Sequence, residues 1–116
     1  MINELLTQLQ SFPETIEFKT VIDAIDNNYQ FSAVEFRNGE LLNAQGTNLG
    51  SCKIFSFAQL HQLSEQQTLH CFGDYYRIDV LQNPDGIDHG NIRNFMQTGW
   101  QGIQFSAPAL ALNSEK

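Results

Sequence analysis

The apolar positions in the first part of the chain follow the spacing of amphipathic helices. Within the first twelve residues they fall at positions i, i+3, i+4 and i+7, namely Ile2, Leu5, Leu6 and Leu9. This spacing predicts a helix over about 1–12 that stops by Pro13. The same period continues through Phe18, Val21, Ile22, Ile25 and Tyr29. It predicts a second helix over about 14–28, which Asn27 and Asn28 end because asparagine tolerates the left-handed conformation.

Two later segments predict a small sheet. Asn38-Gly39 is a strong two-residue turn signal because both residues accept positive φ, so we expect a β-hairpin near 32–44. The stretch A-Q-G-T-N-L-G that follows is typical of a loop. Beyond Trp100, the alternation in G-I-Q-F-S indicates a short strand, which we expect to pair with the hairpin.

The middle of the chain predicts a buried helix. Ser51 is a favoured N-cap residue, and the segment C-K-I-F-S-F-A-Q-L-H-Q-L after it carries apolar side chains all round. A helix that is apolar on every side is usually enclosed by the rest of the protein. We therefore place a helix over 52–63 at the centre of the core.

A further helix follows this central one. Ser64 and Gln67 form the capping-box pattern S-x-x-Q at its start. Its apolar face is formed by Leu69, Phe72, Tyr76 and Val80. Gly73 lies inside it, and a glycine there either permits a close contact with another element or divides the helix. The segment N-P-D-G at 83–86 predicts a turn.

The last helix begins after that turn. Asp88 is predicted to cap it and Gly99 to end it in the left-handed conformation. Its inner face is predicted to be Ile92, Phe95 and Met96. The complete pattern predicts an α+β fold, with several short helices packed around a buried central helix and a small antiparallel sheet or β-hairpin.

Length, charge and cysteine content narrow the class of protein. The 116 residues fit a single domain over 1–116 with a frayed tail over 107–116. Thirteen acidic and six scattered basic side chains give a formal charge of −7, so we expect no nucleic-acid partner. There is no apolar run of about 18 residues, and hence no predicted membrane span. Two cysteines outside any C-x-x-C pattern predict reduced thiols in the bacterial cytoplasm.

One candidate chemistry is a thiol hydrolase. Cys52 would be the nucleophile at a helix N-terminus, and His89, with Asp88 beside it, would be the base. The competing interpretation, which we favour, is that Cys52 and Cys71 are packing residues, because free cysteine is among the most buried residue types. The three histidines lack metal-ligand spacing and the chain lacks a phosphate-binding motif, so we expect no metal and no cofactor.

Polar side chains near the last two helices are the candidate binding residues. Asn91, Arg93 and Asn94 stand beside a core of Phe and Ile, where buried polar groups need partners. Either they bind backbone groups or Asp74 and Asp79, or they face a ligand. The residues selected as binding candidates are Asp74, Tyr76, Arg77, Arg93, Asn94 and Trp100.

Three long segments resemble a known family. They are N-G-E-L-L-N-A-Q-G-T-N-L-G-S-C-K-I-F-S-F-A, F-G-D-Y-Y-R-I-D-V-L and D-H-G-N-I-R-N-F-M-Q-T-G-W-Q-G-I-Q-F. From about Phe18 to Phe105 the chain resembles the HopJ type III effector family of small bacterial proteins. The resemblance implies a history among effectors that plant-pathogenic bacteria inject into host cells. It transfers no catalytic pattern to these residues.

These observations leave three functional hypotheses. We favour a HopJ-like, non-enzymatic domain that binds a protein partner or a small ligand as a monomer, either in the bacterial cytoplasm or after type III secretion into a host cell. The first alternative is the small thiol-dependent hydrolase that uses Cys52 and His89. The second is a bacterial structural or regulatory domain that is not secreted.

Overall fold

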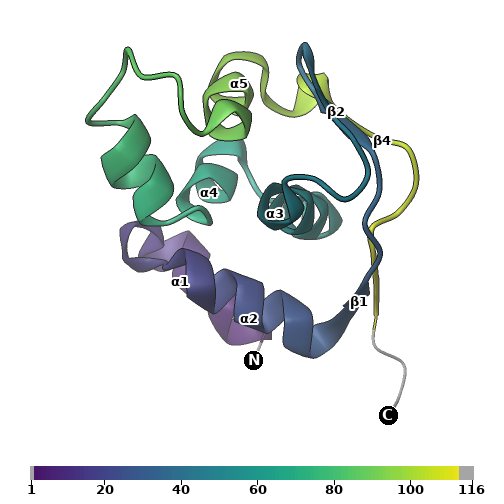
Figure 1. Ribbon diagram of the computed structural model, residues 1–116. Helices are drawn as coiled ribbons and strands as arrows, with labels where there is room; N and C mark the ends of the chain where they lie inside the picture. The colour runs from purple at the N-terminus through teal and green to yellow at the C-terminus, as the bar shows by residue number, and fades with distance from the viewer. Residues whose placement is uncertain (1, 113–116) are drawn as a thin grey trace.

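The computed structural model describes residues 2–112, and the fold is α+β, as the sequence predicts (Figure 1). The helical elements are α1 (Ile2–Ser11), η1 (Pro13–Thr15), α2 (Phe18–Asn28), α3 (Leu49–Leu60), α4 (Glu65–His70), η2 (Tyr75–Val80), α5 (Gly90–Thr98) and η3 (Gly99–Gly102). The strands are β1 (Tyr29–Phe31), β2 (Phe36–Asn38), β3 (Leu41–Asn43), β4 (Ile103–Phe105) and β5 (Leu110–Leu112). In Figure 1, α3 lies between α1 and α2 below and α5 above, with the strands along one flank.

The strands form two small antiparallel sheets. β2 is the middle strand of one sheet, in which Phe36 lies opposite Asn43 of β3 and Phe105 of β4. β1 pairs with β5 in the other sheet. The predicted hairpin is therefore present, and the segment after Trp100 pairs with it as expected.

The hairpin turn lies one residue later than predicted. Asn38 is the last residue of β2 and is 0% exposed, whereas Gly39 and Glu40 form the turn. Only Gly39 takes a positive φ here, at 62°. The register is shifted because the side chain of Asn38 is a buried polar group with partners across the fold, so it belongs to the strand.

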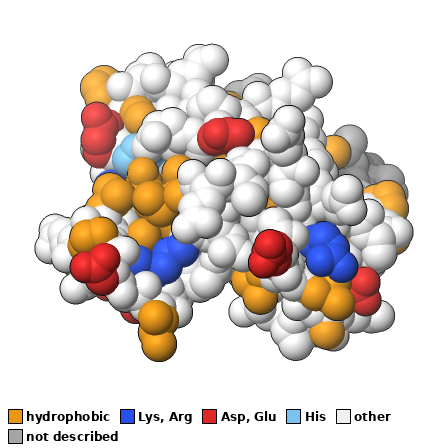
Figure 2. All heavy atoms as spheres, turned by 90° about the horizontal axis from the view of Figure 1, so that it is seen from above, with side chains coloured by type: hydrophobic (Ala, Val, Ile, Leu, Met, Phe, Trp, Pro, Cys, Tyr) orange, Lys and Arg blue, Asp and Glu red, His pale blue; other side chains and the backbone are white. Residues whose placement is uncertain are grey.

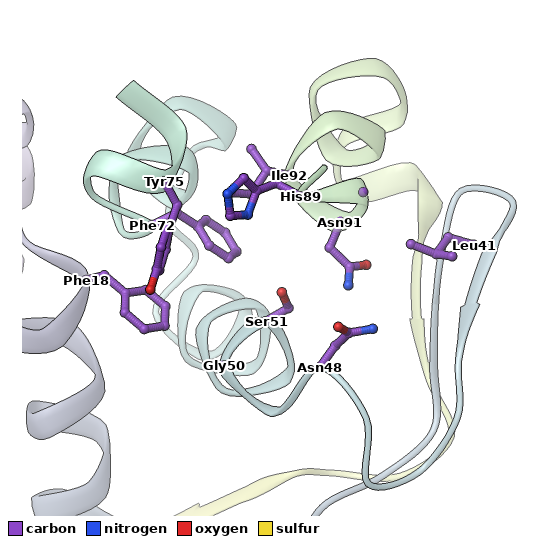
Figure 3. A pocket seen from close by; sticks show the side chains of 11 residues that line it. Phe18, Leu41, Asn48, Gly50, Ser51, Phe72, Tyr75, His89, Asn91 and Ile92 are labelled. Carbon is purple, nitrogen blue, oxygen red and sulfur yellow. The ribbon is translucent and has the colours of Figure 1, made fainter. Parts of the chain in front are cut away.

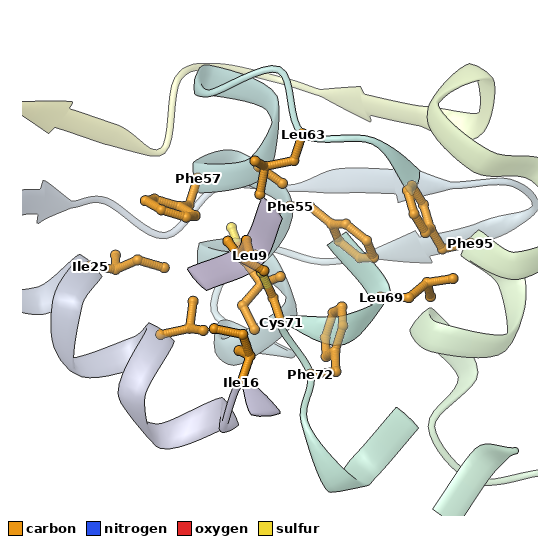
Figure 4. Packing of buried hydrophobic residues seen from close by; sticks show 14 of the residues in the cluster. Leu9, Ile16, Ile25, Phe55, Phe57, Leu63, Leu69, Cys71, Phe72 and Phe95 are labelled. Carbon is orange, nitrogen blue, oxygen red and sulfur yellow. The ribbon is translucent and has the colours of Figure 1, made fainter. Parts of the chain in front are cut away.

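The prediction that the central helix is buried is confirmed. Its enclosed residues are Cys52, Ile54, Phe55, Ser56, Phe57 and Ala58. Figure 4 shows Phe57 lying toward Ile25, and Phe55 lying between Phe72 and Phe95. The ring centroid of Phe55 is 5.5 Å from that of Phe72 and 5.0 Å from that of Phe95. Side chains on different sides of α3 therefore pack against α2 on one side and against the residues around α4 and α5 on the other.

The predicted start and end of this helix were wrong. It spans Leu49–Leu60 rather than 52–63, and its N-cap is Asn48 rather than Ser51. Asn48 takes the left-handed conformation, with φ 50°. The first turn of the helix therefore begins immediately after it, and Ser51 lies within that turn.

The second helix is shorter than the predicted 14–28. Pro13–Thr15 form a separate 3₁₀ turn, and α2 begins only at Phe18. Asn27 and Asn28 stay helical instead of ending the helix in the left-handed conformation, and the backbone becomes extended at Tyr29, with φ −134°. Tyr29 belongs to β1 because it pairs with Leu112 of β5, and the spacing of apolar residues does not reveal this pairing.

The capping box is confirmed, and Gly73 does divide the helix. The Ser64 hydroxyl accepts from the Gln67 backbone N–H at 3.0 Å, and the Gln67 side chain accepts from the Ser64 N–H at 2.9 Å. Gly73 has φ 62°, and a Cβ there would come within 2.7 Å of the backbone N of Phe18. After Gly73 the chain continues as the π-helix η2. The predicted turn at 83–86 is present, with the Gly86 N–H donating to Asn83 O at 3.0 Å.

The last helix differs from the prediction at two positions. Its N-cap is His89 rather than Asp88, and Met96 is 45% exposed rather than inward-facing. Ile92 and Phe95 are buried as expected, and Gly99 ends the helix with φ 60°. Asn91, which is 6% exposed, completes the inner face because its amide finds hydrogen-bonding partners there.

The tail is ordered over part of the predicted frayed range. Leu110–Leu112 form β5, and Ala109 and Leu110 are buried. The Ser32 N–H donates to Ala109 O at 2.8 Å. The chain is therefore paired or buried over 109–112 of the predicted frayed range, and 113–116 lie outside the described residues. No helix within residues 2–112 has the length and hydropathy needed to cross a membrane.

Candidate functional site

A pocket of about 350 Å³ lies where the first turns of two helices meet. From the start of α3 it is lined by Asn48, Gly50 and Ser51. From the start of α5 it is lined by His89, Gly90, Asn91 and Ile92. Figure 3 shows Ser51 and Asn48 on one side of the opening, with His89 and Asn91 facing them. The pocket therefore joins segments that are far apart in the sequence.

Both helices begin with a residue in the left-handed conformation. Asn48 has φ 50° and ψ 51°, and His89 has φ 53° and ψ 51°. Within residues 2–112, neither side chain hydrogen-bonds the first turn of its own helix. The first N–H groups of a helix have no intrahelical acceptor, and they give this end a partial positive charge. Two uncapped helix starts thus border one cavity.

Buried asparagines hold these helix starts in place. Asn91 Nδ2 donates to Asn43 Oδ1 at 2.9 Å, and Asn43 Nδ2 donates to Asn91 Oδ1 at 3.0 Å. Asn38 Nδ2 donates to both the backbone O of Asn91 at 2.8 Å and its Oδ1 at 3.0 Å. Asn48 Nδ2 donates to Asn43 Oδ1 at 2.6 Å. The hairpin therefore positions the first residues of both α3 and α5.

Three aromatic rings form the other wall of the pocket. Phe18 of α2 packs edge-on against Tyr75 of η2, with centroids 5.1 Å apart, and it stacks with Phe72 at 6.5 Å. Figure 3 places these rings together, opposite Asn91 and Leu41. Gly50 lets the Phe18 ring approach α3, because a Cβ at Gly50 would lie 3.0 Å from Phe18 Cζ. Figure 2 shows hydrophobic side chains gathered beside a histidine on this upper face of the molecule.

His89 lines the pocket, and its side chain is about a quarter exposed. Its Nε2 lies 3.0 Å from Asp79 Oδ2, and its ring lies 5.1 Å from that of Tyr75. A carboxylate only accepts hydrogen bonds, so Nε2 carries the proton in this pair. Asp79 thereby fixes the orientation of the imidazole at the edge of the pocket.

Arg93 fastens the loop before α5 rather than facing the pocket. Its guanidinium donates to Asp88 O at 2.6 Å, Asp88 Oδ1 at 2.7 Å and Asn83 O at 2.9 Å. The hydrogen bond from Arg93 holds the pKa of the exposed Asp88 carboxyl below its usual range. Asn94 donates to Asn38 O at 3.1 Å. Both binding candidates on α5 therefore have structural partners.

The structure does not bring Cys52 to His89. Cys52 is 1% exposed, and its thiol lies 4.0 Å from Val34 O, on the hairpin side of α3. Burial raises the pKa of this thiol, which disfavours the thiolate at neutral pH. His89 and Asp88 instead contact Asp79 and Arg93. Among the described residues, no group of three or more His, Cys, Asp or Glu side chains is placed to hold a metal ion.

Three other binding candidates lie around η2. Arg77 donates to Ile16 O and lies 3.1 Å from His70 Nδ1, so it fastens η2 to the segment after η1. Tyr76 is buried, and its hydroxyl accepts from Gln66 Nε2 at 3.1 Å. Asp74 is exposed and borders a separate hollow of about 580 Å³ beside Arg77.

Trp100 is held by the core. Its indole N–H donates to Leu63 O at 3.1 Å, and its ring packs edge-on against Phe95 with centroids 5.1 Å apart. Of the polar residues considered from the sequence, the pocket lining contains His89 and Asn91. Sequence reasoning missed Asn48, Ser51 and the aromatic wall as site residues, because helices distant in the chain bring them together. The density of asparagines from Asn38 to Asn48 was the available signal.

The fold and site define a small α+β protein with a pocket that lies between two helix starts and an aromatic wall. The model of the family described as HopJ type III effector protein matches residues 2–110, and the chain belongs to this family. It is also similar to a protein whose crystal structure is described as that of the "unknown function protein VPA0580". The two are 49% identical, with a TM-score of 0.95 over 97% of this chain and 93% of that chain. A search of curated proteins gave no match.

Proposed function

We propose that the protein is a non-enzymatic binding domain, and that the pocket between α3 and α5 takes a small ligand with an aromatic body and a hydrogen-bond acceptor group. The proposal rests on one observation: this pocket has an aromatic wall and a polar wall. Cavities that combine apolar lining with a few convergent polar groups are typical ligand sites. The aromatic wall would take the ring of the ligand, and the polar wall would orient its acceptor.

The polar wall favours an acceptor because it offers donors. Within the described chain, the Ser51 hydroxyl has no hydrogen-bond partner that would compete with a ligand. The first backbone N–H groups of α3 and α5 have no acceptor within their own helices, so they can donate to a ligand. His89 adds its Nδ1, which donates when the ring is protonated. Asn91, by contrast, is fully engaged with Asn43 and Asn38, so it holds the site rigid rather than adapting to a ligand.

The position of Cys52 supports binding over thiol hydrolysis. A thiol nucleophile must be exposed to its substrate and lie within reach of its base. Cys52 is enclosed beside Val34, while His89 is engaged with Asp79. Among the described residues, no hydrogen bond joins the Ser51 hydroxyl to His89, so we propose a domain that binds without turnover.

Three small aromatic probes test this proposal: benzoate, benzamide and benzylammonium, titrated into ¹⁵N-labelled protein. We expect benzoate and benzamide to shift the amide signals of Gly50, Ser51 and Gly90, and benzylammonium to bind at least tenfold more weakly. His89→Asn should weaken benzoate binding by about fivefold, the value of one ordinary hydrogen bond. Asparagine is chosen because it tolerates the left-handed backbone at this position.

Met96→Ala is the matched control, because Met96 is exposed on the same helix and does not line the pocket. It should leave benzoate binding unchanged. Tightest binding by benzylammonium would contradict the proposed donor wall. An absence of amide shifts at Gly50, Ser51 and Gly90 with all three probes would reject this pocket as the binding site.

The family description supports a secretion context, and we propose that this domain acts after type III export. A fusion of the first 25 residues to a translocation reporter tests this point separately from ligand binding. Signal in host cells that depends on the secretion system supports export. Loss of signal would favour a domain that acts within the bacterium, and the pocket experiment would be unaffected.

A further inference from the structure

A second cavity, of about 550 Å³, lies beside the C-terminal half of α3. Ser56, Gln59 and Leu60 form its helical wall, and the segment 105–110 between β4 and β5 forms the other. It shares no lining residue with the pocket between α3 and α5. The two cavities therefore present separate surfaces along the same central helix.

Ser56, which lines this cavity, has an unsatisfied hydroxyl. The residue is 7% exposed, and Ser56 Oγ has no hydrogen-bond partner within residues 2–112. A hydroxyl can donate one hydrogen bond and accept two, and burying it without a partner lowers stability. The other serine of the cavity is different, because Ser106 Oγ donates to Glu35 O at 2.9 Å. One hydroxyl thus has a partner within the fold, and the other is buried without one among the described residues.

The other lining residues of this cavity favour a ligand without charge. Among the described residues, those bordering this cavity are apolar or neutral and include Leu60, Pro108 and Leu110. An ion placed there would lose hydration without meeting an opposite charge. An apolar body would instead cover the half-exposed Leu60 side chain, which is 55% exposed.

We propose that this cavity is a second binding site, for a neutral small molecule with an apolar body and one hydroxyl or carbonyl group that hydrogen-bonds Ser56 Oγ. The apolar body lies against Leu60 and the 105–110 segment. The proposal does not depend on the pocket between α3 and α5, because the lining residues and the chemistry of the ligand both differ.

Titration of ¹⁵N-labelled protein with 1-hexanol tests the site, with hexanoate and hexylammonium as charged analogues of equal chain length. We expect 1-hexanol to shift the amide signals of Ser56, Leu60 and Ala109, and to leave those of Gly50 and Gly90 unchanged. Both charged analogues should bind at least tenfold more weakly. Equal or tighter binding by either of them, or no shift with 1-hexanol, overturns the proposal.

Ser56→Ala and Ser106→Ala form a matched pair within the cavity. Without ligand, Ser56→Ala should raise the melting temperature, because it removes an unpaired buried hydroxyl, and Ser106→Ala should lower it. With 1-hexanol, Ser56→Ala should weaken binding about fivefold, and Ser106→Ala should leave it within twofold. If Ser56→Ala lowers the melting temperature and leaves 1-hexanol affinity unchanged, the hydroxyl serves an internal water and the site is rejected.

Discussion

Asn91 and Asn43 exchange two hydrogen bonds between their side-chain amides, one from α5 to β3 and one in the opposite direction. Both residues are almost fully buried, at 6% and 1% exposure. A buried amide that loses its partner bears a desolvation cost, so this pair specifies one relative placement of hairpin and helix. It also sets where α5 begins, and thus the shape of the pocket.

Asn91→Ala should therefore cost about 3 kcal/mol of unfolding free energy, because it leaves the buried Asn43 Nδ2 without its acceptor and removes one of the two acceptors of Asn38 Nδ2. Urea denaturation followed by circular dichroism measures the loss. Asn94→Ala is the control on the same helix, since Asn94 is only partly buried and makes one hydrogen bond to Asn38 O. Its expected loss is about 1 kcal/mol. Equal losses for the two variants would show that the asparagine network is not cooperative.

Phe57→Ala should be strongly destabilising, because Phe57 is 0% exposed on the central helix. Removing a buried aromatic ring typically costs about 3–5 kcal/mol, a large part of the stability of a small domain. Leu60→Ala is the control, one turn later and 55% exposed, and should change the melting temperature little. An unchanged melting temperature for Phe57→Ala would place this face of α3 on the surface.

Two glycine substitutions should differ in their effect on stability. Gly73→Ala should lose at least about 2 kcal/mol, because Gly73 has φ 62° and its added Cβ would press on the Phe18 backbone. Gly90→Ala should be neutral or gain up to about 1 kcal/mol, since its Cβ would meet only Leu41 Cδ2, at 3.6 Å. Thermal unfolding of both variants measures the difference. Similar melting temperatures would contradict the close packing of η2 against α2.

Cys52 should react slowly with a thiol reagent at pH 7 in the folded protein. Burial raises the pKa of this thiol and keeps reagent away, so labelling waits for local opening. The experiment uses a Cys71→Ala background, with a short peptide thiol for comparison. His89→Asn should leave the rate unchanged. Labelling faster than the peptide, and dependent on His89, would revive the thiol hydrolase.

Cys71 should make the protein sensitive to alkaline pH. Burial raises the pKa of its thiol from 9.0 to about 12, so the folded state keeps a proton that the unfolded state releases. Stability from this group is fully present below pH 9 and is lost as pH rises, at about 1.4 kcal/mol per pH unit. Urea unfolding between pH 8 and pH 10.5 measures the slope. In Cys71→Ala the decline above pH 9 should be shallower, and parallel curves would show that Cys71 is solvated.

Local chemistry accounts for the features that the sequence predicts well. The Ser64–Gln67 capping box involves residues three apart, so its hydrogen bonds are readable from the chain. The all-round apolar character of α3 also predicts its burial correctly. The N-caps of α3 and α5 could not be read in this way. Ser51 and Asp88 have the favoured chemistry, but Asn48 and His89 occupy the caps in the left-handed conformation, and their side chains are held by Asn43 and Asp79.

The site was predictable only in part, for the same reason. His89 could be predicted as a site residue because a histidine side chain can donate or accept a hydrogen bond or bind a proton. The His89 ring is held at the pocket by its contacts with Asp79 and Tyr75, which belong to η2. The pocket residues that lie across from it belong to α2 and α3. Arg93 and Trp100 looked like binding residues because their side chains are large and polar at the tip. The fold uses both to satisfy backbone carbonyls instead.

β1 finds its partner, and β2 finds its second partner beside β3, only among the last residues of the described chain, where Leu112 lies opposite Tyr29 and Phe105 opposite Phe36. During synthesis on a ribosome, α1 to α5 therefore emerge while both strands still have an open edge. Pairing between residues so distant in sequence is slow, and open edges attract other chains. Both sheets can therefore form completely only after the 103–112 segment has been translated. A nascent chain stalled before this segment would expose two strand edges with unpaired backbone N–H and C=O groups, which could pair with other chains.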